Sequence, residues 1–121
     1  MSKRIIYLDD DLGFLSLLEK VTLEKFPSCK VELYSCPLKF MTREEAACSL
    51  VVLDLSLGAE FTGIHVAKEF RKTDKETPLV VMSGFSTEYV RPSFEGIDIN
   101  DFWDKGFDLL NLKDKLKPYL L

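Results

Sequence analysis

The chain has 121 residues, of which 46% are hydrophobic and 30% charged, with a formal net charge of −4. This length supports one domain, and the composition leaves enough apolar residues for one core. The acidic balance argues against direct binding of nucleic acid, because no basic surplus is available to neutralise phosphates. We therefore expect a single domain over residues 1–121, with no effector domain.

The N-terminus and the cysteines predict a cytoplasmic protein without a membrane anchor. Only four apolar residues follow Arg4 before the first aspartates, too few for a signal peptide, and no apolar segment is long enough to span a membrane. The three cysteines form no C-x-x-C pair, so we interpret them as reduced thiols. A metal–thiolate site is the alternative, but no ligand spacing supports it and the only histidine, His65, fits an ordinary surface position.

In the first half of the chain, short apolar runs at residues 4–8 and 30–34 predict strands that flank a helix. The helix is expected over about 12–26, ending near Pro27. Its inner face is predicted from the spacing i, i+3, i+4 and i+7 of Phe14, Leu17, Leu18 and Val21. Pro37 suits the first turn of a second helix, whose inner face is predicted to hold Leu38 and Met41.

In the second half, apolar runs predict strands at 50–53, 78–82 and 101–104. Thr62 can cap the next helix, whose inner face is predicted to hold Gly63, Val66, Ala67 and Phe70. A further helix is expected to begin near Thr87 and to be short or broken, because Pro92 falls inside it. The last helix is expected to bury Leu109, Leu112 and Leu116.

This strand–helix alternation, repeated five times, predicts an α/β fold with a five-stranded parallel sheet between two layers of helices. The strands are almost continuously apolar, as strands covered on both faces must be. Ligands of such open sheets bind just beyond the carboxyl ends of the strands. Residues at those ends are therefore the candidate functional residues.

Side chains that phosphoryl-transfer chemistry can use lie at the ends of four predicted strands: Asp9 and Asp10, Asp54, Ser83, and Lys105. Carboxylates that lie close together repel one another, and a hard divalent cation such as Mg²⁺ relieves this repulsion. Asp54 is the candidate nucleophile, because a carboxylate that attacks phosphorus forms an acyl phosphate. Lys105 can supply the cation and Ser83 the hydroxyl donor that the developing charge needs. Asp11 fits a structural role as the cap of the following helix.

In their order and separations, these residues resemble the receiver domains of two-component response regulators, of the stand-alone type, over the whole chain. The resemblance implies a flavodoxin-like (βα)5 fold, doubly wound, with strand order 2-1-3-4-5. It makes Asp54 the phosphoacceptor and Ser83, Lys105 and the aromatic Phe102 the switch residues. It also implies that Mg²⁺ (or Mn²⁺) is held by Asp10, Asp54 and the backbone carbonyl of Ser56, with Asp9 acting through water.

The resemblance further implies a signalling switch, and not a turnover enzyme. A histidine kinase or histidine phosphotransfer protein would donate the phosphoryl group. A downstream protein would dock on the surface formed by the helix beginning near Thr87, the strand 101–104 and the last helix, and a phosphorylation-dependent homodimer is a further implied possibility. The residues do not distinguish an output switch from a phosphate shuttle or sink.

The chain departs from the family pattern in several places. Gly58 stands where the family usually has proline, and Gly63 comes one residue late, so the loop from Ser56 to Thr62 is expected to be longer or bulged. Gly106 replaces the proline that commonly follows the lysine, and we expect a trans bond there. Phe85 is bulky where the family tunes water access, which predicts slow self-dephosphorylation.

Three alternatives remain. A pseudo-receiver, a protein-binding module that is not phosphorylated, is favoured by the departures and disfavoured by the complete set of site residues. A phosphohydrolase of the haloacid-dehalogenase type would need a second aspartate where Ser56 stands. A nucleotide-binding flavodoxin or Rossmann-type protein would need a glycine-rich turn after the first strand, where this chain has three aspartates.

Overall fold

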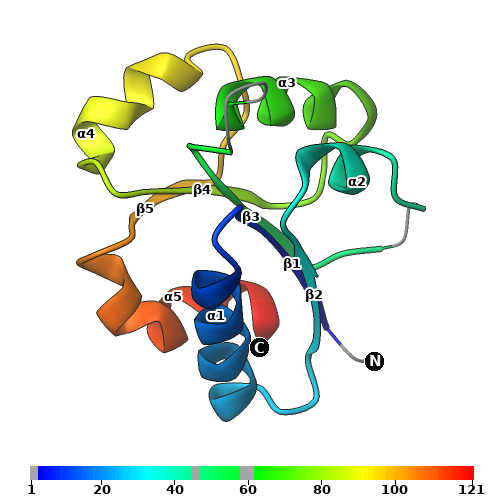
Figure 1. The fold of residues 1–121 in the computed structure, drawn as a ribbon, viewed down its shortest axis with the longest axis vertical. Helices are drawn as coiled ribbons and strands as arrows, with labels where there is room; N and C mark the ends of the chain where they lie inside the picture. Colours follow the sequence, from blue (N-terminus) through cyan, green and yellow to red (C-terminus); the bar gives the residue numbers. More distant parts are fainter. Residues whose placement is uncertain (1–2, 45–46, 58–61) are drawn as a thin grey trace.

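The computed structural model describes residues 3–44, 47–57 and 62–121, and contains one five-stranded parallel sheet (Figure 1). The strand order is β2-β1-β3-β4-β5, which confirms the flavodoxin-like arrangement. The strands are β1 (Arg4–Leu8), β2 (Lys30–Tyr34), β3 (Leu50–Asp54), β4 (Leu79–Ser83) and β5 (Asp101–Asp104). Every pairing is parallel, so all five carboxyl ends lie at one edge of the sheet.

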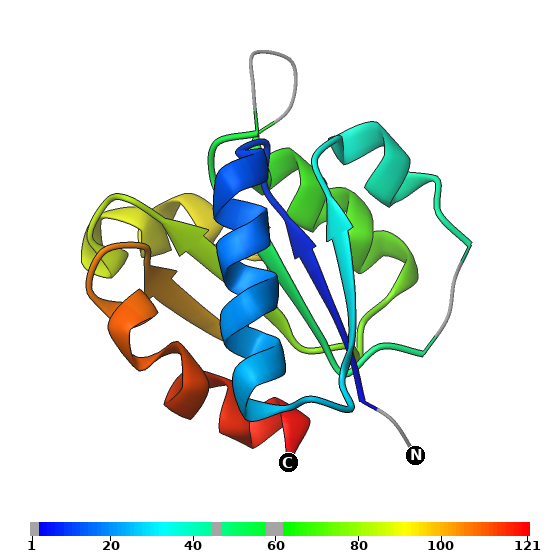
Figure 2. The same ribbon diagram turned by 60° about the horizontal axis from the view of Figure 1, so that its bottom comes forward.

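Two layers of helices cover the sheet (Figure 1). One layer holds α1 (Leu12–Lys25) and α5 (Leu112–Leu120), the latter preceded by the 3-10 turn η2 (Asp108–Asn111). The other layer holds α2 (Pro37–Met41), α3 (Gly63–Thr73) and α4 (Thr87–Val90), which continues as the 3-10 turn η1 (Arg91–Phe94). Figure 2 shows α1 and α5 in front of the sheet, and the ion pair between Glu24 and Lys113, 3.2 Å long, joins them.

Strands β1, β3 and β4 are almost entirely buried because both faces of the sheet are covered, as their continuous apolar sequences predict, whereas the edge strand β2 is half-buried and β5 is buried only at its centre. Side chains alternate between two cores, one beneath α1 and α5 and one beneath α2, α3 and α4. The first core contains a buried hydrogen bond of 2.6 Å between the Tyr7 hydroxyl and Thr22 Oγ1. Thr22 in turn donates to the Leu18 carbonyl, so Tyr7 is the donor in this pair.

Two predicted inner faces are wrong in detail. Helix α1 buries Leu15, Leu18 and Thr22, whereas Leu17 is 42% exposed. Apolar residues occur almost all around this helix, so their spacing alone did not fix which face lies inward. In α2 the buried residues are Pro37 and Phe40, whereas of the two predicted residues Met41 is half-buried and Leu38 is exposed. A helix of five residues is too short for spacing to define a face.

Helix α3 begins as expected, with the Thr62 side chain accepting a hydrogen bond from the His65 backbone N–H. Its first residue, Gly63, lies directly against the end of β3. A Cβ atom at Gly63 would lie 2.6 Å from the Asp54 carbonyl oxygen and 2.8 Å from Leu55 Cα. This close approach requires glycine, and it packs the start of α3 against the strand that carries Asp54.

The remaining expectations for the backbone are met where the structure describes them. Helix α4 is a single turn from Thr87 that becomes 3-10 at Arg91, as Pro92 predicts. Within the described ranges all peptide bonds are trans, including that between Lys105 and Gly106. The predicted irregularity of the loop at Gly58 lies outside the described residues. None of the described helices is both long and apolar enough to cross a membrane.

Candidate functional site

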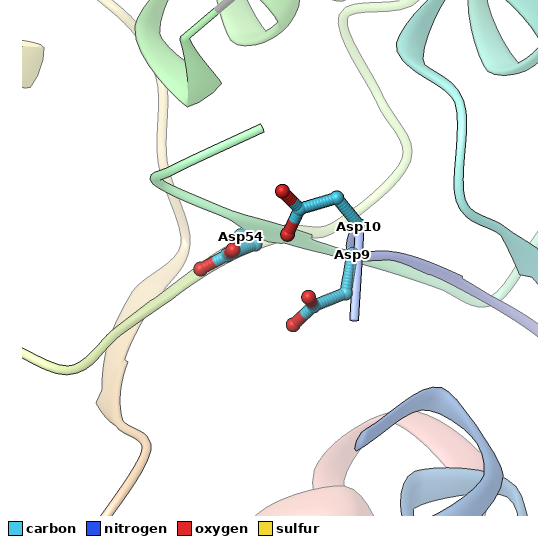
Figure 3. Close-up of side chains that lie close together, drawn as sticks. All are labelled: Asp9, Asp10 and Asp54. Atoms are coloured by element: carbon cyan, nitrogen blue, oxygen red, sulfur yellow. The ribbon is translucent and has the colours of Figure 1, made fainter. Parts of the chain in front are cut away.

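Three carboxylates meet at the carboxyl edge of the sheet. Asp9 and Asp10 follow β1, and Asp54 ends the adjacent strand β3, which is paired in register through Leu8 and Leu53. One oxygen atom from each of the three carboxylates lies within 4.8 Å of the others (Figure 3). Asp9 and Asp54 are buried, whereas Asp10 is exposed, so the cluster is open to solvent on the Asp10 side.

Lys105 supplies the cation of this cluster. Its Nζ atom lies 2.8 Å from Asp9 Oδ2 and 3.2 Å from Asp54 Oδ1, so the ammonium bridges two strands. The Lys105 backbone N–H donates to the Ser83 carbonyl at 2.8 Å, which fixes the loop after β5 against the end of β4. The strand order thus brings residues from β1, β3, β4 and β5 together at one place.

The electrostatics of the cluster disfavour the negative charge of Asp54 in the absence of another cation. Burial and, next, the charge of Asp9 raise the pKa of Asp54 to about 6, and the ammonium of Lys105 offsets part of this rise. Burial alone would lower the pKa of Lys105, but the hydrogen bond to Asp9 and the charge of Asp54 raise it instead. Lys105 is therefore a cation, and its single charge does not balance the carboxylates.

The unbalanced cluster suits a divalent cation. Three carboxylates carry three negative charges against the single positive charge of Lys105, and all of their donor atoms are oxygen. Hard cations such as Mg²⁺ prefer this oxygen donor set, and Asp9, Asp10 and Asp54 would hold such an ion here. The residues present therefore fit the magnesium site that the sequence predicted.

Asp11 has the structural role that the sequence assigned to it. Its side chain accepts a hydrogen bond from the Phe14 backbone N–H and caps α1. Its own backbone N–H donates to Asp9 Oδ1 at 2.9 Å, so the start of α1 also orients the Asp9 carboxylate. Ser56 lies two residues beyond Asp54 and forms an isolated bridge with Thr62.

The two remaining predicted site residues are Ser83, at the end of β4, and Phe102, within β5. Ser83 is buried, and its Oγ accepts a hydrogen bond from the Phe85 backbone N–H at 3.0 Å. Phe102 is buried with its ring 5.5 Å from that of Phe94, and the Arg91 guanidinium lies 4.8 Å above it. Phe102 therefore belongs to the core beneath α4 and does not contact the acidic cluster directly.

Sequence reasoning missed one residue of the site. Phe14 was predicted to be an ordinary core residue, yet its ring centroid lies 4.6 Å from Lys105 Nζ. The signal was available, because long side chains in the first turn of a helix point back toward its N-terminus. A helix that starts directly after the aspartates places such a ring over the ends of the strands.

The sequence matches the family described as the response regulator receiver domain over residues 5–117. The chain therefore belongs to this family of two-component signalling domains, which are switches rather than turnover enzymes. Its Asp9, Asp10 and Asp54 cluster is consistent with a phosphorylatable switch, and membership implies a histidine kinase partner.

Three relatives illustrate the match. An uncharacterized transcriptional regulatory protein of Bacillus subtilis, YkoG, is 31% identical over 78 residues, which are 63% of this chain and 33% of YkoG. The matched segment thus spans about a third of that curated relative.

Two solved structures are similar in fold. TrrA of Thermotoga maritima, in complex with Mg²⁺ and a beryllium fluoride, gives a TM-score of 0.80 at 24% identity, covering 98% of this chain and 99% of TrrA. The chemotaxis response regulator CheY4 of Vibrio cholerae gives 0.83 at 15% identity, covering 99% of this chain and 100% of CheY4. At these identities the two structures support the fold alone.

Proposed function

We propose that this receiver domain is a phosphorylation-controlled switch that accepts a phosphoryl group from a phosphohistidine donor onto Asp54. The observation that carries the proposal is the position of Lys105, whose ammonium bridges Asp54 and Asp9 inside the acidic cluster. A nucleophilic carboxylate, a fixed cation and a set of oxygen ligands are the components that phosphoryl transfer requires.

In the proposed reaction, an Asp54 carboxylate oxygen attacks phosphorus while the P–N bond of the phosphohistidine breaks. The imidazole of the donor leaves with the bonding electron pair, and the new acyl phosphate stays on Asp54. Lys105 already contacts Asp54 Oδ1 and can neutralise the phosphoryl oxygens that arrive there. Ser83, at the end of the neighbouring strand, is the proposed hydroxyl donor to the same oxygens.

The proposed metal ligands are Asp10, Asp54 and the backbone carbonyl of Ser56, with Asp9 acting through water. Mg²⁺ or Mn²⁺ bound there supplies positive charge to the transferring phosphoryl group. The protein residues orient the nucleophile: Asp9 is held by the Asp11 backbone N–H, and Asp54 by its position at the end of β3.

The proposed conformational output passes from Ser83 to Phe102 and then to the α4–β5–α5 face. Phe102 packs against Phe94 of η1 and beneath Arg91, so any change in its rotamer alters contacts with the broken fourth helix. A downstream protein, or a second phosphorylated copy of the chain, would recognise this face. Direct binding of nucleic acid or of a membrane is not part of the proposal, and the proposed location is the cytoplasm.

The test is the intact mass of the protein after incubation with acetyl phosphate, with and without Mg²⁺. We expect a Mg²⁺-dependent gain of one phosphoryl group in the wild type and in an Asp98→Asn control. Asp98 is an exposed residue that precedes β5, at the opposite edge of the sheet. The Asp54→Asn variant should show no gain.

The second candidate is a pseudo-receiver, a binding module that does not carry phosphate. The broken fourth helix and Gly106 favour it over an ordinary receiver. No mass gain, together with no detectable Mg²⁺ binding, would support this candidate and refute the phosphorylation switch. A gain that persists in the Asp54→Asn variant would refute Asp54 as the phosphoacceptor.

A further inference from the structure

Lys105 contacts an aromatic ring as well as two carboxylates. The Phe14 ring centroid lies 4.6 Å from Lys105 Nζ, while Asp9 and Asp54 lie at 2.8 and 3.2 Å. The Lys105 side chain is only 24% exposed, so water has limited access to this ammonium. Cation–π attraction is stronger for such a partly desolvated cation than for one in bulk water.

The backbone fixes the position of the ring. Asp9 Oδ1 accepts the Asp11 backbone N–H, and Asp11 Oδ1 accepts the Phe14 backbone N–H. Two hydrogen bonds therefore connect the carboxylate that binds Lys105 to the residue whose ring contacts the same ammonium. Phe14 is half-buried against the core beneath α1, which restricts its side-chain rotamers.

We propose that Phe14 is a positioning residue that holds the Lys105 ammonium between Asp9 and Asp54. The proposal rests on the function proposed above and adds a residue to its machinery. In the described part of the chain, Lys105 is the only cation paired with the acidic cluster, so its position controls the charge available at Asp54. Because Lys105 binds Asp9 and Asp54, it also competes with any divalent cation that uses the same two carboxylates.

Because of this competition, removal of the Phe14 ring should have opposite effects on metal binding and on phosphoryl transfer. Without the ring, the ammonium spends less time on the carboxylates, so a divalent cation binds more tightly. Phosphoryl transfer at saturating metal becomes slower, because Lys105 is less often in place beside Asp54. A purely structural role for Phe14 would instead weaken metal binding and transfer together. Both changes should be about two- to five-fold, the range that a cation–π contact of about 0.5–1 kcal/mol produces.

The first test measures free Mn²⁺ by electron paramagnetic resonance during titration of the protein. The Phe14→Leu variant keeps an apolar side chain and should lower the Mn²⁺ dissociation constant about two- to five-fold. Phe14→Trp, which offers a better cation–π partner, should raise it. Phe107→Leu is the matched control: Phe107 lies two residues after Lys105 but is 74% exposed, and its substitution should change nothing. An unchanged or raised constant for Phe14→Leu would overturn the proposal.

The second test repeats Phe14→Leu in a Lys105→Met background. If the ring acts through the ammonium, the substitution should have no further effect on the Mn²⁺ dissociation constant there. An equal effect in both backgrounds would mean that Phe14 acts through packing, and would refute the positioning role.

A spectroscopic signature separates this inference from the proposed function. The ε-methylene protons of a lysine that lies over a ring are shifted upfield by the ring current. The Lys105 signal, assigned with the Lys105→Met variant, should be upfield in the wild type and in Phe107→Leu and should move back in Phe14→Leu. Neither this readout nor Mn²⁺ binding needs phosphorylation, so a protein that never accepts phosphate can still pass both tests. A Lys105 signal without the shift refutes the inference and leaves the phosphoryl-transfer proposal standing.

Discussion

The burial of Asp54 predicts that its charge destabilises the metal-free protein. The side chain ends a fully buried strand beside Asp9, which raises the pKa of Asp54 from 3.8 to about 6. The difference corresponds to about 3 kcal/mol, at 1.36 kcal/mol for each pH unit. The Asp54→Asn substitution removes the charge while keeping the shape, and should therefore raise the free energy of unfolding at neutral pH.

The stability that Asp54→Asn gains over the wild type should increase with pH. Between pH 3.8 and about 6 the folded protein holds a proton on Asp54 that the unfolded chain has already released. The free energy of unfolding of the wild type therefore falls as pH rises through this window, and this contribution is constant above it. The Asp54→Asn variant lacks this dependence. Its advantage should be about 1 kcal/mol at pH 4.5 and about 3 kcal/mol at pH 7.5.

Urea unfolding, followed by fluorescence, measures this advantage. Trp103 is the only tryptophan and is buried, so its emission reports global unfolding. The titrations need EDTA, because a bound cation would neutralise the cluster. Asp98→Asn serves as the control for removal of an exposed carboxylate and should show less than about 0.5 kcal/mol of change. An Asp54→Asn variant that is no more stable than the wild type at pH 7.5, or whose gain is the same at pH 4.5, would refute the reasoning.

Three further predictions concern the site and the core. Mg²⁺ at one hundred times its dissociation constant should stabilise the wild type by about 2.7 kcal/mol and the Asp54→Asn variant by less, and equal shifts in urea unfolding would contradict the proposed metal site. Phe85→Ala should shorten the lifetime of the proposed acyl phosphate, measured by intact mass after removal of the donor, on the sequence-based interpretation that Phe85, two residues after Ser83, limits the access of water. The same lifetime in both proteins would argue against shielding. Tyr7→Phe should lower the free energy of unfolding by about 1 kcal/mol through loss of the buried bond to Thr22 Oγ1, and no loss in urea titration would contradict that account.

The fold could be predicted from the sequence because its strands are short, apolar and sharply bounded. Three of the five predicted strands, β1, β2 and β5, match the observed strands at both ends, and the other two, β3 and β4, differ by no more than one residue at either end. Strand ends carry the site residues in this fold, so predicting the strands also predicted which side chains meet. The approach of Lys105 to Asp9 and Asp54 follows from strand order, which hydrophobic pattern alone does not give.

The inner faces of α1 and α2 were predicted less well than that of α3, whose four predicted residues are all buried, and the reason is physical. The first helix has apolar residues on several sides, so the burial of Leu15 instead of Leu17 depends on how α1 and α5 pack together. The same limitation hid Phe14, which fits an apolar stripe in the sequence but contacts a cation in the structure. The place of Phe14 in the first turn of α1 indicates that its ring lies near the strand ends, but its partner Lys105 is 91 positions away and is brought there by the strand order.

The hydrogen bond of Ser83 indicates how large an energy change the proposed switch would involve. Its Oγ accepts the Phe85 backbone N–H, a neutral bond worth about 0.5–1.5 kcal/mol. In the proposed phosphorylated state, rotation of the Ser83 hydroxyl toward the phosphoryl group gives up that bond for one to a charged oxygen, worth about 1.5–3 kcal/mol. The net gain is therefore about 1 kcal/mol, too small to hold one state alone. In the proposed mechanism, contacts of Lys105 with the phosphoryl group and of a partner with the α4 side of Phe102 would add to this gain and shift the balance.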